Sequence, residues 1–134
     1  MLAIDQLFKS GDVTPITVWL DGMISEATAI HASHPDYLNR DLRKQVLRGG
    51  EENPFNSPWF KQVDSREQRE SILNDPSPCI VLATSGMMTG GPIMEYFKNW
   101  APELNNTLCF VGYQASGTMG RRLQSGHPEV PMVD

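Results

Sequence analysis

The amino-acid sequence predicts an α/β domain with a mostly parallel sheet flanked by helices. Short, continuous apolar runs recur along the chain, and such runs are typical of parallel strands that are covered on both faces. Amphipathic patterns with the period of an α-helix stand between these runs. Strands that alternate with helices form units with right-handed crossovers, so the alternation indicates this fold class.

Three segments have the composition of strands: Ile16–Leu20, Cys79–Ala83 and Leu108–Val111. Each is rich in β-branched, aromatic or other apolar residues, and proline, glycine or asparagine stands beside it. Trp59–Val63 is a weaker candidate, which we expect as a short edge strand. The tail Glu129–Asp134 has the pattern of a strand that begins and then stops.

Helical patterns occupy the intervals between the strands. They cover the residues around Ile4–Phe8, Met23–His31, Leu38–Val46, Ser65–Leu73, Ile93–Trp100 and Met119–Leu123. Among them, Ser65–Gln68 has the form of a capping box, in which a serine hydroxyl and a glutamine three residues later satisfy the first backbone N–H groups.

Length and composition predict one globular domain. The chain has 134 residues, of which 40% are hydrophobic and 20% charged, a balance without the signature of disorder. The first helical pattern begins abruptly at Met1, so we expect a fragment, residues 1–134, truncated at both ends. No apolar run approaches the roughly 18–20 residues that span a bilayer, and the N-terminus lacks the features of a signal peptide.

Net charge and cysteine content indicate how a polyanion could bind and in which compartment the protein works. The formal net charge of −5 argues against a protein that coats nucleic acid through its overall charge, so a polyanion would have to bind at a local site. Cys79 and Cys109 each lie in or at the start of an apolar run. We expect both as buried, reduced thiols, which fits a cytoplasmic protein.

Two glycine-rich segments are the candidate binding site: the first turn, Ser85–Gly91, and the second turn, Gly112–Gly120. Each follows a predicted strand and precedes a predicted helix, where backbone N–H groups and the helix dipole favour anions. Hydroxyls and two arginines add donors suited to phosphate. The candidate residues are Ser85, Gly86, Thr89, Gly90, Gly91, Gln114, Ser116, Gly117, Thr118, Arg121 and Arg122.

Glycines also serve sharp turns that bind nothing. The content of hydroxyls and arginines exceeds what turn geometry needs, and this favours an anion site. Neither turn matches a Walker A loop or the G-x-G-x-x-G pattern, which disfavours hydrolysis of a nucleoside triphosphate. Met87, Met88 and Met119 are expected to fill the packing, with stacking against bases as the alternative.

We expect no metal site and no catalytic residue in this chain. His31 and His34 lack a nearby third ligand, and His127 stands in a predicted loop. None of the motifs H-x-H-x-D-H, C-x-x-C, H-E-x-x-H or G-x-S-x-G is present.

Four motifs follow one another in the second half of the chain: Ser85–Pro92, Glu95–Phe97, Asn106-Thr107 and Gly112–Arg122. Together they resemble the β-CASP region of metallo-β-lactamase-fold ribonucleases. In the first half, Asp21–Met23, Glu26–His31 and Asn53–Phe55 are most similar to archaeal homologues of the cleavage and polyadenylation specificity factor, a type also described as a transcription termination factor. The resemblance extends from about Ile16 to Glu129.

The resemblance implies a Rossmann-like domain that forms one wall of an RNA cleft. In that family, two zinc ions on the metallo-β-lactamase domain of the same parent chain activate the attacking water. None of the family's zinc ligands matches a position here, so the zinc would belong to the parent protein and the fragment alone would be inactive. The implied activity is endoribonuclease, with 5′→3′ exoribonuclease as a further option, on single-stranded RNA.

Two other interpretations stay open on the sequence. A Rossmann-like module could hold a small phosphorylated ligand or a nucleotide. Alternatively, the helix in Asp36–Arg48 could dock a partner or a second copy of the protein in a homodimer. Binding that strengthens with RNA length and weakens with salt would separate the RNA wall from the nucleotide module.

Overall fold

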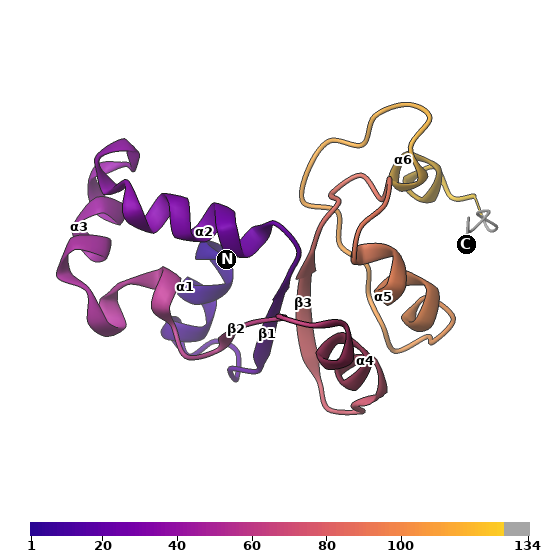
Figure 1. Ribbon diagram of the computed structural model, residues 1–134, viewed down its shortest axis with the longest axis horizontal. Helices are drawn as coiled ribbons and strands as arrows, with labels where there is room; N and C mark the ends of the chain where they lie inside the picture. The colour runs from indigo at the N-terminus through magenta and orange to yellow at the C-terminus, as the bar shows by residue number, and fades with distance from the viewer. Residues whose placement is uncertain (128–134) are drawn as a thin grey trace. The chain divides into compact units, whose positions relative to one another are not determined.

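The structure is a computed structural model, and it describes residues 1–127. Nine helices and strands follow one another in these residues (Figure 1). They are α1 (Leu2–Ser10), β1 (Thr17–Asp21), α2 (Ile24–Ser33), α3 (Arg40–Arg48), β2 (Phe60–Gln62), α4 (Arg66–Asn74), β3 (Cys79–Ala83), α5 (Ile93–Trp100) and α6 (Met119–Gln124). Three short 3-10 helices, Pro35–Tyr37, Gly50–Glu52 and Pro54–Asn56, lie between α2 and β2.

The chain divides into two compact units. Unit 1 comprises residues 1–63 and 76–82, and unit 2 comprises residues 64–75 and those from 83 onward. Unit 1 contains the sheet, and unit 2 contains both glycine-rich turns.

Unit 1 confirms the predicted α/β class. Its three-stranded parallel sheet has the order β2-β1-β3, and β1 pairs with β2 in the register Val18 to Phe60. Alternate residues of β1, Val18 and Leu20, are buried against Phe8 of α1. The segment predicted as an edge strand, Trp59–Val63, contains β2 and stands at one edge of the sheet.

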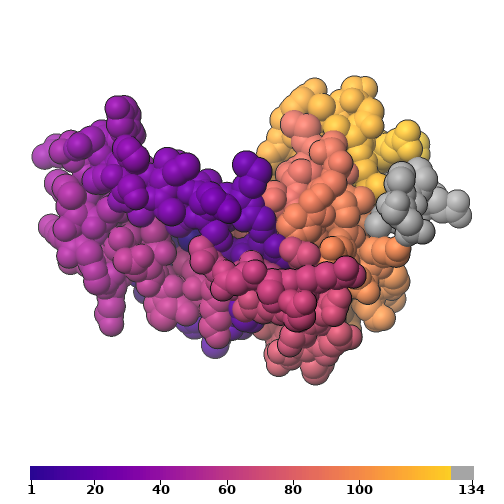
Figure 2. All heavy atoms as spheres, viewed as in Figure 1, coloured from indigo at the N-terminus to yellow at the C-terminus, as the bar shows by residue number. Residues whose placement is uncertain are grey.

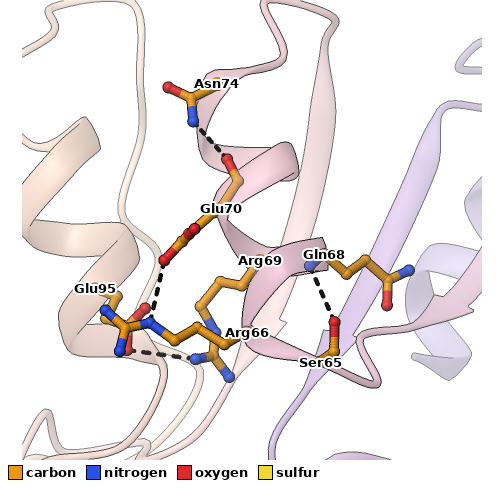
Figure 3. Close-up of polar contacts among 7 residues, drawn as sticks. All are labelled: Ser65, Arg66, Gln68, Arg69, Glu70, Asn74 and Glu95. Atoms are coloured by element: carbon orange, nitrogen blue, oxygen red, sulfur yellow. Dashed lines mark hydrogen bonds and ion pairs between the residues drawn. The ribbon is translucent and has the colours of Figure 1, made fainter.

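In unit 2, α4 packs against α5, and Figure 3 shows one contact between them, that of Arg69 with Glu95. Arg69 of α4 lies 3.3 Å from Glu95 of α5, and the indole N–H of Trp100 donates to the carbonyl of Leu73 at 3.4 Å. Tyr96 is buried, with its ring centroid 5.2 Å from that of Trp100. Because α5 begins directly after the first turn, this pairing holds the base of that turn.

The predicted capping box is present in part. Ser65 Oγ accepts from the N–H of Gln68 at 3.1 Å, as predicted (Figure 3). The returning bond goes to the residue before the cap, since the N–H of Asp64 donates to Gln68 Oε1 at 2.9 Å.

Two predictions about the apolar runs are wrong. Leu108–Val111 forms no strand in the described part of the chain, and the side chain of Val111 is 99% exposed. An apolar run becomes a strand only when its backbone pairs with a neighbour, and this segment makes no such ladder. Cys109 lies in this segment and is exposed, so the prediction that it is buried is wrong. Cys79 is half-buried, and both cysteines are free thiols.

The tail Glu129–Asp134, for which a strand start was predicted, lies outside the described residues. Within residues 1–127, no helix combines the length and apolar character needed to cross a membrane.

Candidate nucleic-acid interface

The first turn is organised by the hydroxyl of Ser85. Ser85 Oγ accepts from the N–H of Thr89 at 2.9 Å and lies 3.1 Å from both the hydroxyl of Thr89 and the carbonyl of Gly90. The backbone closes the turn as well, because the N–H of Ser85 donates to the carbonyl of Gly90 at 3.1 Å. Ser85 therefore shapes its own turn.

Gly91 is required where the first turn meets α5. Its φ is +78°, a left-handed conformation that side chains disfavour. A Cβ there would also lie 2.8 Å from the carbonyl oxygen of Thr84, well inside van der Waals contact. That carbonyl accepts from the N–H of Ile93 at 3.0 Å, so the start of α5 is tied back to the end of β3.

The second turn is organised by Thr118, the N-cap of α6. Its hydroxyl donates to the carbonyl of Ala115 at 2.7 Å and accepts from the N–H of Arg121 at 3.2 Å. The N–H of Thr118 also donates to Ala115 at 3.2 Å. Gly117, with a φ of +86°, reverses the chain between them. Thr118 thus fixes the start of α6, the helix that carries Arg121 and Arg122.

Gln114 joins the two turns. Its side chain is 2% exposed, and Nε2 donates to the carbonyl of Gly86 at 2.9 Å and to that of Gly112 at 3.2 Å. A second link runs from the N–H of Gly120 to the carbonyl of Met87, at 3.2 Å. Figure 2 shows the result, with yellow spheres of the second turn and α6 against the salmon spheres of the first turn. The two turns therefore form one continuous surface within unit 2.

The donors available to an anion differ from those expected at helix N-termini. At the start of α5, the N–H groups of Ile93, Met94 and Glu95 donate to backbone carbonyls. In the two turns, in contrast, several backbone N–H groups donate to no acceptor among the described residues, among them those of Gly90, Gly91, Ser116 and Gly117. The glycine-rich loops themselves therefore present the free amides.

Arg121 and Arg122 supply the positive charge. Both side chains are exposed, and in the part of the chain that the structure describes neither forms an ion pair. Guanidinium groups in this state can pair with phosphate through two hydrogen bonds. We call the two turns together with these arginines the rim.

The structure brings all predicted site residues into the rim but gives them different exposures. Seven are exposed, namely Gly86, Thr89, Gly91, Ser116, Gly117, Arg121 and Arg122, while Ser85, Gly90 and Thr118 are half-buried and Gln114 is buried. The sequence singled out Gln114 as a contact residue, whereas the structure places its amide in hydrogen bonds within the protein. Its position inside the second turn gave no sign of that link.

The methionines of the turns differ as well. Met88 is 3% exposed and has a φ of 55°, so it packs inside the first turn as the packing interpretation predicts. Met87 and Met119 are half-buried.

The histidines form no cluster. His31 Nδ1 lies 2.6 Å from the carbonyl of Ala27, and His34 Nδ1 lies 3.1 Å from that of Ile30. Across residues 1–127, no group of three histidine, cysteine, aspartate or glutamate side chains is placed to hold a metal ion. The described residues therefore do not fit a zinc site.

Comparison with known proteins identifies relatives of this chain. The Beta-Casp domain family matches residues 1–123. The chain is 57% identical over 133 residues to transcription termination factor FttA of Methanosarcina mazei. It is 48% identical over 134 residues to the factor of the same name from Cenarchaeum symbiosum, and 51% identical over 133 residues to that from Pyrococcus abyssi.

These matches cover 99% or 100% of this chain but only 20% or 21% of each relative. The chain therefore spans about a fifth of the length of the curated relatives it matches.

Proposed function

This chain belongs to the β-CASP domain family, and we propose that it is a β-CASP fragment, residues 1–134, that forms the RNA-binding wall of a zinc-dependent ribonuclease. The relatives at 44–57% identity bear the name transcription termination factor, which supports a role in RNA 3′-end cleavage and transcription termination. The activity is that of an endoribonuclease, with 5′→3′ exoribonuclease activity as an addition, and the setting is the cytoplasm.

The observation that carries this proposal is the rim. Two turns, joined by Gln114, present free amide N–H groups, the exposed hydroxyls of Thr89 and Ser116, and two arginines that form no ion pair with the described residues. Such donors bind phosphates at successive positions of a strand without reading its bases. On this proposal, the rim fixes the register of single-stranded RNA.

The hydrolytic step is assigned to another part of the parent protein. No group of three potential ligands lies within the described residues, so the two zinc ions implied by the family resemblance belong to the metallo-β-lactamase domain of the same parent chain. The contribution of this chain is to bind and orient the strand. That the protein forms a homodimer is a prediction from the sequence alone.

The direct test is the double variant Arg121→Ala/Arg122→Ala in the whole protein that carries this chain. We expect weaker RNA binding and slower cleavage of a long RNA, with unchanged zinc content by elemental analysis. Unchanged cleavage kinetics would contradict the proposal. Loss of zinc would also contradict it, because the rim would then act through the metal centre.

A nucleotide-binding module would behave differently. Our proposal requires that affinity for the whole protein rise with RNA length and that a mononucleotide compete poorly. Saturable binding of a mononucleotide at the strength of a long RNA would favour the module instead.

A further inference from the structure

Tyr113 stands out in the second turn because its side chain is 77% exposed. Among the described phenylalanine, tyrosine and tryptophan residues of unit 2, it is the only exposed one. Tyr96 is buried, and Phe97, Trp100 and Phe110 are half-buried. A large aromatic ring on the surface gains little from burial, so packing does not explain its place.

The backbone on both sides of Tyr113 is fixed. Gln114 Nε2 donates to the carbonyl of Gly112 at 3.2 Å and to that of Gly86 at 2.9 Å. The residue before Tyr113 and the residue after it are therefore held together and tied to the first turn. With Gln114 turned inward and buried, Tyr113 is left in solvent on an anchored loop.

The phosphate donors of the rim lie close to Tyr113 along the chain. Ser116 and Gly117, which have free N–H groups, follow three and four residues later. Since consecutive Cα atoms are about 3.8 Å apart, Ser116 Cα lies within about 11 Å of Tyr113 Cα. An anchored ring and a set of phosphate donors at this separation suit adjacent parts of one nucleotide strand.

We propose that Tyr113 stacks on a base of the bound RNA strand and is a further binding residue of the rim. The inference rests on the proposed function, because it takes RNA as the ligand. Stacking on a tyrosine accepts every base, since each base has a π-face. Single-stranded RNA, whose bases are unstacked and accessible, is the form that such a ring recognises.

Tyr37 offers a matched control. It is 88% exposed, but it lies in unit 1 on the 3-10 helix Pro35–Tyr37, where its ring centroid is 6.4 Å from that of His34. It has the same side chain and a similar exposure, and no residue of the rim lies in its unit.

The test measures RNA affinity of the whole protein with Tyr113→Ala, Tyr113→Phe and Tyr37→Ala. Stacking predicts that Tyr113→Ala weakens binding by roughly 5- to 150-fold. We expect Tyr113→Phe to keep most of the affinity, because it keeps the ring, and Tyr37→Ala to bind as the unchanged protein does. A thermal melt checks that the variants stay folded.

Abasic RNA separates stacking from other effects. For the unchanged protein, removing the base that meets Tyr113 should lower affinity about as much as Tyr113→Ala does. The same abasic site should then cost the Tyr113→Ala protein little. Equal losses in both proteins would overturn the inference, because the ring and the base would then act independently.

Failure of this inference is distinguishable from failure of the proposed function. If Tyr113→Ala binds RNA normally while Arg121→Ala/Arg122→Ala binds weakly, the rim holds phosphates and the stacking inference is wrong. If neither variant changes RNA affinity, the RNA-binding wall itself is wrong.

Discussion

The side chain of Gln114 occupies the space that a side chain at position 120 would need, so this position requires glycine. A Cβ on Gly120 would lie 1.8 Å from Gln114 Oε1 and 3.2 Å from the carbonyl oxygen of Met87. Gln114 cannot turn aside freely, because its Nε2 holds two carbonyls and the side chain is buried. This pair of residues therefore maintains the link between the two turns.

Gly120→Ala is expected to destabilise the protein by about 1–3 kcal/mol, the usual cost of forcing extra atoms into a packed site. The measurement is denaturant unfolding of the variant against the unchanged protein. Gly112→Ala is the matched control, since no heavy atom lies within 4 Å of the Cβ it would add and its φ is not left-handed. Equal stability of Gly120→Ala and Gly112→Ala would contradict the assigned contact.

Single residues also show where sequence reasoning reached its limit. The sequence predicted a helix over Met119–Leu123, and the structure begins this helix at Met119 with Thr118 as its N-cap, a position that threonine favours. The inward turn of Gln114 could not be predicted, because its partner, the carbonyl of Gly86, lies 28 residues away. Backbone carbonyls occur at every position and leave no mark in a sequence.

Among the elements, α6 is short and depends on its cap. It spans six residues, Met119–Gln124, and isolated helices of this length do not persist in water. Thr118 Oγ1 satisfies the N–H of Arg121 and ties the turn to Ala115. The direction of both arginines therefore depends on this hydroxyl.

Thr118→Ala is expected to cost about 1 kcal/mol of folding free energy, as for other N-caps, and to weaken RNA binding by the whole protein. Thr118→Ser keeps the hydroxyl, so it should retain most of both properties. Denaturant unfolding measures the folding free energy, and RNA titration measures the affinity for RNA. RNA affinity that falls equally in both variants would show that the lost methyl group, and not the cap, is responsible.

The strands were predicted unevenly, and the reason lies in pairing. The runs Ile16–Leu20 and Cys79–Ala83 correspond to β1 and β3. β1 has buried residues, whereas every residue of β3 is half-buried. Leu108–Val111 has a similar composition and forms no strand in the described residues. Composition records how apolar a segment is, but it carries no information on whether a partner strand lies beside it.

At the scale of the whole molecule, the net charge is negative, whereas the rim carries two positive charges. The sequence carries 11 lysines and arginines against 16 aspartates and glutamates, so a polyanion meets a net negative chain. The rim places Arg121 and Arg122 together beside free amides. Binding must then be local and sensitive to salt.

Zinc content is a prediction at the same scale. No three potential ligands come together in residues 1–127, so this chain prepared alone should carry no stoichiometric zinc by elemental analysis. The whole parent protein, measured in parallel, should carry about two ions per chain if it has the two-metal site that the proposed function assigns to it. One bound zinc per molecule of the isolated chain would contradict the assignment of the metal to another domain.

The central claim is that the rim binds the phosphates of RNA, and the salt dependence of affinity tests it most directly. Each phosphate contact on a single strand contributes about 0.7 to the slope of log affinity against log salt, so Arg121→Ala/Arg122→Ala should reduce the slope by about 1.4 in the whole protein. Arg40→Ala/Lys44→Ala removes the same charge from exposed positions of α3 in unit 1 and should leave the slope nearly unchanged. Equal slopes for the two double variants would contradict the claim, because the arginines of the rim would then act only through net charge.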